Sequence, residues 1–105
     1  MTDKLIVFVT CGNRDEAERI ATAVVDDRLA ACVNVLPGVR SCYVWEEKLT
    51  WSDEVMLVIK TTEARYVALQ SKIRELHSYD VPEIVAMPIA MGFDKYLAWI
   101  ANSTK

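Results

Sequence analysis

A chain of 105 residues is long enough for one domain and short for two, so we expect a single domain over residues 1–105. Its formal net charge of −3, with acidic and basic residues interspersed, excludes the positive footprint of a nucleic-acid-binding protein. No stretch reaches the roughly 18 apolar residues that cross a membrane, so we expect no membrane partner.

The apolar fraction of 52% is slightly above the range of about 45–50% for soluble domains. A small domain has much surface for its volume and needs less apolar content rather than more. Scatter among small domains would explain the excess, but we favour a buried interface between subunits.

The three cysteines, Cys11, Cys32 and Cys42, form an odd set with no Cys-x-x-Cys pair. This usage is typical of free thiols in a reducing compartment. The apolar run near the N-terminus follows the acidic Asp3 and lacks a small-residue cleavage site, so it predicts a strand and not a signal peptide. We therefore expect a cytoplasmic protein.

The first half of the chain predicts a strand, a helix and a very long strand. Residues 5–9 are a continuous apolar, β-branched run, which predicts a central strand buried on both faces. Asn13 and Glu16 have the spacing of a helix cap, and apolar residues then recur at helical spacing. The long strand covers residues 29–46, with a bulge or bend at the Pro-Gly pair of residues 37–38.

The second half supplies the remaining elements: a hairpin turn at 47–48, a return strand at 50–61, a helix at 63–76, a strand at 83–87 and a short helix at 93–102. In the last helix we expect Tyr96, Leu97 and Ile100 to face inward. The order of the first six elements predicts a ferredoxin-like α+β fold, with both helices on one face of an antiparallel sheet.

The length of this strand indicates that the chain assembles with another chain. Ordinary strands have about 5–6 residues, and a small domain cannot pair one nearly three times as long over its whole length. Because unpaired strand edges recruit other chains, the far half at residues 39–46 requires a partner. A second copy of the same chain is the simplest partner.

The same stretch carries a resemblance to a known family. Leu-Ala-Ala-Cys-Val-Asn at 29–34, Leu-Pro-Gly at 36–38 and Tyr-Val-Trp-Glu at 43–46 are similar to the signature of the CutA family, the divalent-cation tolerance proteins. Three further blocks fit, at residues 54–61, 77–83 and 96–100, so the resemblance runs from about residue 5 to residue 100. It implies the same fold with an extended β-hairpin, and tight homotrimers whose hairpins complete each other's sheets.

His77 is the single histidine and a candidate metal ligand. It could equally be a helix C-terminal histidine stabilised by the helix dipole. The resemblance implies copper binding, but the copper-binding members carry paired histidines here and a cysteine late in the first strand. This chain has Leu76 and Val9 at those positions, and Ser78 replaces the proline that follows.

Cys11 lies two residues beyond Val9 and could act as a displaced ligand, or could be a partly buried thiol in a turn. No cofactor is required by any motif. If a divalent ion binds, we expect copper to bind most tightly, because affinity at nitrogen and sulfur sites rises to copper along the first transition row.

The resemblance also implies that several polar residues lie near clefts between subunits: Cys32, Glu54, Lys60, Tyr79 and Glu83. They could bind a small polar ligand or form structural ion pairs, and Cys32 could act as a small buried apolar residue. Cys42 lies outside the family pattern and receives no role. Tyr43, Trp45 and Trp51 lie on the hairpin, where we favour contacts within the trimer over ligand stacking.

The sequence contains no phosphate-binding loop, no Gly-x-Ser-x-Gly nucleophile motif and no His-Glu-x-x-His pair. An enzyme using Lys60, Tyr79 and a carboxylate is the weakest hypothesis, so we expect no catalysis. The leading hypothesis is a homotrimeric divalent-cation tolerance protein involved in the response to metal ions. The alternative is a trimeric regulator, similar in fold to the PII proteins, that senses a small ligand in clefts between subunits.

Overall fold

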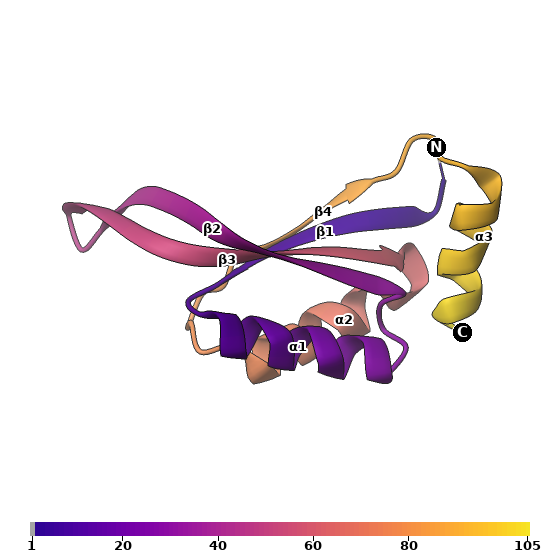
Figure 1. The fold of residues 1–105 in the computed structure, drawn as a ribbon, viewed down its shortest axis with the longest axis horizontal. Coiled ribbons are helices and arrows are strands. Elements are labelled where there is room, and N and C mark those ends of the chain that lie inside the picture. The colour runs from indigo at the N-terminus through magenta and orange to yellow at the C-terminus, as the bar shows by residue number, and fades with distance from the viewer. Residues whose placement is uncertain (1) are drawn as a thin grey trace.

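The computed structural model describes residues 2–105. Its elements are β1 (Lys4–Cys11), α1 (Arg14–Asp26), β2 (Cys32–Trp45), β3 (Lys48–Thr62), α2 (Glu63–Leu76), β4 (Ile84–Pro88) and α3 (Asp94–Ser103). The strands form one antiparallel sheet in the order β2-β3-β1-β4, and α1 and α2 cover one of its faces (Figure 1). This is the predicted ferredoxin-like arrangement.

The core lies between the sheet and the two covering helices. In β1, Leu5, Val7 and Val9 are buried, whereas Ile6 and Phe8, on the other face, are only partly buried. The expectation of a strand buried on both faces was therefore wrong for the single chain. Helices pack against only one face of the sheet in the described residues, and alternate side chains of a strand point to opposite faces.

The ends of α1 are as the sequence predicts. The side chain of Asn13 accepts a hydrogen bond from the backbone N–H of Glu16, at 2.8 Å. Ala17, Ile20 and Val24 are fully buried and attach the helix to the sheet. In α2 the buried residues are Leu69 and Ile73, with Tyr66 and Leu76 packed partly against the same core.

The hairpin of β2 and β3 projects beyond the rest of the sheet (Figure 1). Its register shifts between Leu36 and Val39, so the predicted bulge is confirmed, and Gly38 has a φ of +83° that favours glycine. The turn lies one residue earlier than predicted, at Glu46 and Glu47. Trp45 pairs with Lys48, which leaves a two-residue loop with φ values of 49° and 66°.

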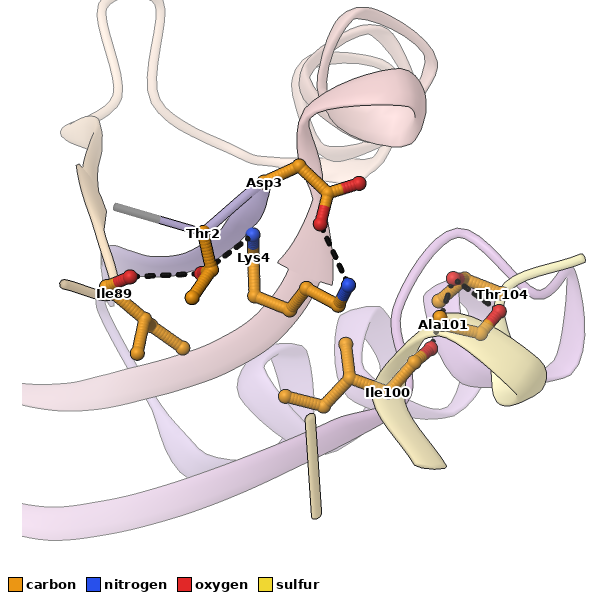
Figure 2. Close-up of polar contacts among 7 residues, drawn as sticks. All are labelled: Thr2, Asp3, Lys4, Ile89, Ile100, Ala101 and Thr104. Carbon is orange, nitrogen blue, oxygen red and sulfur yellow. Dashed lines mark hydrogen bonds and ion pairs between the residues drawn. The ribbon is translucent and has the colours of Figure 1, made fainter. Parts of the chain in front are cut away.

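The opposite end of the sheet is closed by α3 and the N-terminal residues. The Thr2 hydroxyl donates to the Ile89 carbonyl at 2.7 Å, and the Thr104 hydroxyl donates to the Ile100 carbonyl at 2.9 Å (Figure 2). Ile100 faces inward as predicted, but Tyr96 is 41% exposed and stacks on Trp99 at the surface, so its predicted orientation was wrong. None of the described helices has the length and apolar character to cross a membrane.

We predict that replacing the two residues of the hairpin turn will raise the stability of the protein. Glutamate at positive φ is strained, and asparagine followed by glycine suits this type of turn. The double variant Glu46→Asn, Glu47→Gly should raise the free energy of unfolding by about 1 kcal/mol in urea denaturation. Gly38→Ala is the matched control and should lower it, so a lower stability in the turn variant would contradict the backbone described for the tip.

Candidate functional site

The candidate site lies where β1 ends. β1 stops at Cys11, opposite Val55, while β3 continues along the hairpin without β1 beside it. The first turn of α1 and the loop after α2 converge on this end of β1. Three different elements therefore bring polar side chains to the point where the sheet narrows.

His77 joins the end of α2 to the end of β1. Its Nε2 lies 2.7 Å from the carbonyl oxygen of Thr10, and the backbone N–H of Tyr79 donates to its Nδ1 at 3.0 Å. Because Nδ1 accepts, the proton is on Nε2, which donates to Thr10. The imidazole is buried and its orientation is fixed by backbone groups on both sides.

Glu16 is the site residue that sequence reasoning missed. Its side chain is turned inward from the first turn of α1, with only 4% of the residue exposed, and Oε1 lies 3.4 Å from His77 Nδ1. Oε1 is buried and has no hydrogen-bond partner in the described residues. The sequence assigned Glu16 to capping, but only its backbone N–H takes part in the cap. Burying a carboxylate oxygen without a partner costs free energy, so Oε1 of Glu16 is a candidate ligand for a cation.

Cys11 completes a cluster of three different ligand types. The Cys11 sulfur, a Glu16 carboxylate oxygen and a His77 ring nitrogen lie within 4.8 Å of one another. Burial, followed by the charges of Glu16 and Glu54, raises the pKa of the Cys11 thiol to about 12. The two predicted candidates, His77 and Cys11, are therefore adjacent. Val9 lies fully buried in the core.

Tyr79 packs against His77 beside this cluster. Its ring centroid is 4.7 Å from that of His77, and its hydroxyl donates to Glu54 Oε2 at 2.9 Å. Burial, the hydrogen bond to Glu54 and the nearby negative charge raise the pKa of Tyr79 to about 12. A Cβ at Gly12 would lie 3.1 Å from the Tyr79 hydroxyl, so glycine leaves room for the ring.

A cleft of about 490 Å³ opens on the other side of Tyr79. It runs along one face of the hairpin beside the loop after α2, and it is lined by aromatic, acidic and small side chains: Thr10, Tyr43, Trp45, Glu54, Tyr79, Asp80 and Val81. Glu54 and Tyr79, which the resemblance places near clefts between subunits, both line this cleft of the single chain. The volume is within the range of small-molecule sites.

The other residues expected near clefts between subunits, namely Cys32, Lys60 and Glu83, do not line this cleft of the single chain. Cys32 pairs with Lys60 at the far end of the hairpin, where the Lys60 ammonium donates to Asn34. Glu83 is exposed just before β4 and does not line the cleft. Cys42 is exposed on the hairpin.

The three hairpin aromatics do not form one surface. Tyr43 pairs with Thr50 and Cys42 pairs with Trp51, and adjacent residues of a strand point to opposite faces. Tyr43 and Trp45 therefore share the cleft face, whereas Trp51 lies on the reverse face, where the Arg40 guanidinium is 5.2 Å from its ring. Sequence spacing alone grouped side chains that the pairing register separates.

We predict a loss of stability in alkali. Cys11 and Tyr79 have folded pKa values of about 12, raised from ordinary values of 9.0 and 10.0. Above pH 9 the unfolded chain releases protons that the folded chain keeps, so the free energy of unfolding is complete below that pH and falls as pH rises towards 12. Urea denaturation across this range measures it. Cys11→Ala should flatten the first part of the decline and Cys42→Ala should not; equal slopes in both variants would exclude Cys11 as a cause.

Comparison with known proteins agrees with this architecture over nearly the whole chain. Residues 5–103 match the family described as "CutA1 divalent ion tolerance protein". The divalent-cation tolerance protein CutA of Thermus thermophilus is 42% identical over 99 residues, which is 94% of this chain and 96% of the relative. The chloroplastic protein CutA of Arabidopsis thaliana is 44% identical over 101 residues, 96% of this chain, which spans only 56% of that longer relative.

Solved structures show the same fold. CutA from Xylella fastidiosa superimposes with a TM-score of 0.97 at 36% identity, covering 99% of this chain and 100% of the other. A periplasmic divalent-cation tolerance protein CutA from Archaeoglobus fulgidus gives a TM-score of 0.94 at 32% identity, covering 97% and 99% of the two chains. Relatives are thus named from a chloroplast and from a periplasm. The family is not an enzyme family, and this chain belongs to it: it is a member of the CutA divalent-cation tolerance proteins.

Proposed function

We propose that this CutA protein acts in divalent-cation tolerance by binding one cation directly, with Cys11, Glu16 and His77 as ligands. The observation that supports this most is the buried Oε1 of Glu16, which faces the His77 ring and has no hydrogen-bond partner among the described residues. A cation between the three side chains would supply the missing partner and neutralise a buried negative charge.

The donor set indicates which ions suit the site. One thiolate, one imidazole and one carboxylate favour the later first-row ions, whereas magnesium and calcium prefer sites built from oxygen alone. Cu²⁺ should bind most tightly and Zn²⁺ next. Nε2 of His77 donates to the Thr10 carbonyl, so Nδ1 is the nitrogen that would ligate, and a cation there would displace the Tyr79 backbone N–H that now bonds to it.

The Cys11 thiol makes binding dependent on pH. Its pKa of about 12 means that the thiol is protonated at neutral pH, and a cation must displace that proton to reach the sulfur. Binding should therefore release about one proton, and the affinity should rise about tenfold per pH unit below the pKa of the Cys11 thiol.

We also propose that the protein is a homotrimer. The sheet face that the helices leave uncovered carries partly exposed apolar residues, namely Ile6 and Phe8 of β1 with Val85 and Met87 beside them on β4. The reverse face of the hairpin adds Val44, Leu49 and Trp51, all exposed in the single chain. Apolar surface of this extent is typical of an interface between subunits. The three free thiols support a reducing compartment such as the cytoplasm.

We predict that metal binding depends on Glu16 and Cys11. In calorimetric titrations of the reduced, metal-stripped protein with Zn²⁺, Glu16→Gln and Cys11→Ser should each weaken binding by about 100-fold, because each removes a ligand. Zinc is the ion for the thiol comparison because copper oxidises thiols. Repeating the titration in buffers of different ionisation enthalpy measures the released proton.

Matched controls lie close by. Glu18→Gln changes an exposed carboxylate one turn from the site on the same helix, and Cys42→Ser removes an exposed thiol. Both should bind as the wild type does. If Glu16→Gln binds Zn²⁺ as tightly as Glu18→Gln, the cluster is not the site.

We predict an assembly of three times 11.9 kDa by light scattering on a size-exclusion column. Met87→Glu places a charge on the uncovered sheet face, where the residue is 50% exposed, and should dissociate the assembly. Val67→Glu, at a position 78% exposed on α2, is the control and should leave the mass unchanged. A monomeric wild type at micromolar concentration would contradict the proposal.

A further inference from the structure

Glu54 is a second buried carboxylate whose charge is not balanced. It is 8% exposed, and none of the ion pairs in residues 2–105 involves it. Its one side-chain hydrogen bond in this part of the chain is with the neutral hydroxyl of Tyr79, which reaches Oε2. Burying a carboxylate without a cation is expensive, so the position favours a positively charged partner.

The cleft around Glu54 has the composition of a site for a cation. Its walls carry the aromatic rings of Tyr43, Trp45 and Tyr79, and a second carboxylate, Asp80, lies at its exposed edge. No lysine, arginine or histidine lines it. Aromatic faces and carboxylates attract ammonium and guanidinium groups, whereas a bare metal ion would find few ligand atoms among these rings.

The shape of the cleft is maintained by specific contacts. The Tyr79 ring is fixed by the hydrogen bond to Glu54, by the packing on His77 and by the space that Gly12 leaves for it. Tyr43 is tied to the hairpin by a hydroxyl contact of 3.2 Å with Ser52. Two of the three aromatic rings, those of Tyr43 and Tyr79, are therefore positioned before any ligand arrives.

From this arrangement we propose that the cleft binds a small organic cation, an ammonium or guanidinium group on an apolar stem, with the charge against Glu54 and the stem against the aromatic rings. The cavity of about 490 Å³ accommodates such a molecule with room to spare. This site uses residues other than the three metal ligands, so it does not depend on the proposed metal function. The proposal also assigns a class of ligand to the alternative hypothesis, in which the protein is a regulator that senses a small molecule.

The test compares three probes that share one stem and differ in charge: phenethylammonium, neutral 2-phenylethanol and anionic 3-phenylpropanoate. In metal-stripped buffer with a chelator, the ammonium compound should bind wild-type protein at least about tenfold more tightly than the alcohol, and the anion should not bind. The indole N–H signals of Trp45, Trp51 and Trp99, assigned by single Trp→Phe variants, report the location. Only the Trp45 signal should move, because Trp45 alone of the three lines the cleft.

Glu54→Gln keeps the size of the side chain and an acceptor for Tyr79 while removing the charge. It should abolish the preference for the ammonium compound over the alcohol. Asp53→Asn is the control, because Asp53 is 88% exposed on the reverse face of the strand and pairs with Arg40. That variant should keep the wild-type preference.

Equal binding of the ammonium compound and the alcohol to the wild type would overturn the proposal, and this comparison needs no variant to fold. Absence of binding by all three probes would also overturn it, since it would mean that a neighbouring copy fills the cleft. A shift of the Trp51 signal instead of Trp45 would place the ligand elsewhere. Because the chelator removes metal, failure of the metal proposal would leave this result unchanged, and the reverse also holds.

Discussion

The mismatch in length between β1 and β3 is the constraint on which both sites depend. β1 ends opposite Val55, but β3 extends seven residues further towards the hairpin tip, from Glu54 back to Lys48. A sheet that loses a strand part of the way along leaves space beside the continuing strand. The loop after α2 lies beside the end of β1. There His77 bonds to the carbonyl of Thr10 on β1, and Tyr79 bonds to Glu54 on β3.

The contact of His77 with Thr10 places two chemically different environments back to back. On the helix side, the buried side chains of Glu16 and Cys11 lie close to the imidazole, with their ligand atoms within 4.8 Å of one another. On the hairpin side, the Tyr79 ring presents an aromatic face to an open cleft. The Tyr79 ring thus lies between the proposed metal ligands and the cleft proposed for an organic cation. Glu16 and Glu54 are both buried, and neither pairs with a lysine or an arginine within residues 2–105.

Sequence reasoning was reliable where local rules decide the structure. The cap at Asn13, the helix at Glu63–Leu76 and the bulge at Gly38 each follow from residue type and spacing, and the family resemblance supplied the same fold. It failed where tertiary context decides. Glu16 has the spacing of a capping residue, and nothing in the sequence reports that its side chain turns towards His77, 61 positions later. The separation of Trp51 from Tyr43 and Trp45 depends on a pairing register fixed by a two-residue turn, which the sequence placed one residue too late.

The alternation along the hairpin has a consequence for how this protein can change. Residues of one parity face the cleft and residues of the other parity face away, and between Val39 and Trp45 every position of β2 has a partner of matching orientation on β3. A substitution on one face of the hairpin therefore leaves the side chains of the other face unchanged. An insertion of one residue would instead move every side chain beyond it to the opposite face, so a single-residue change in length alters both faces at once.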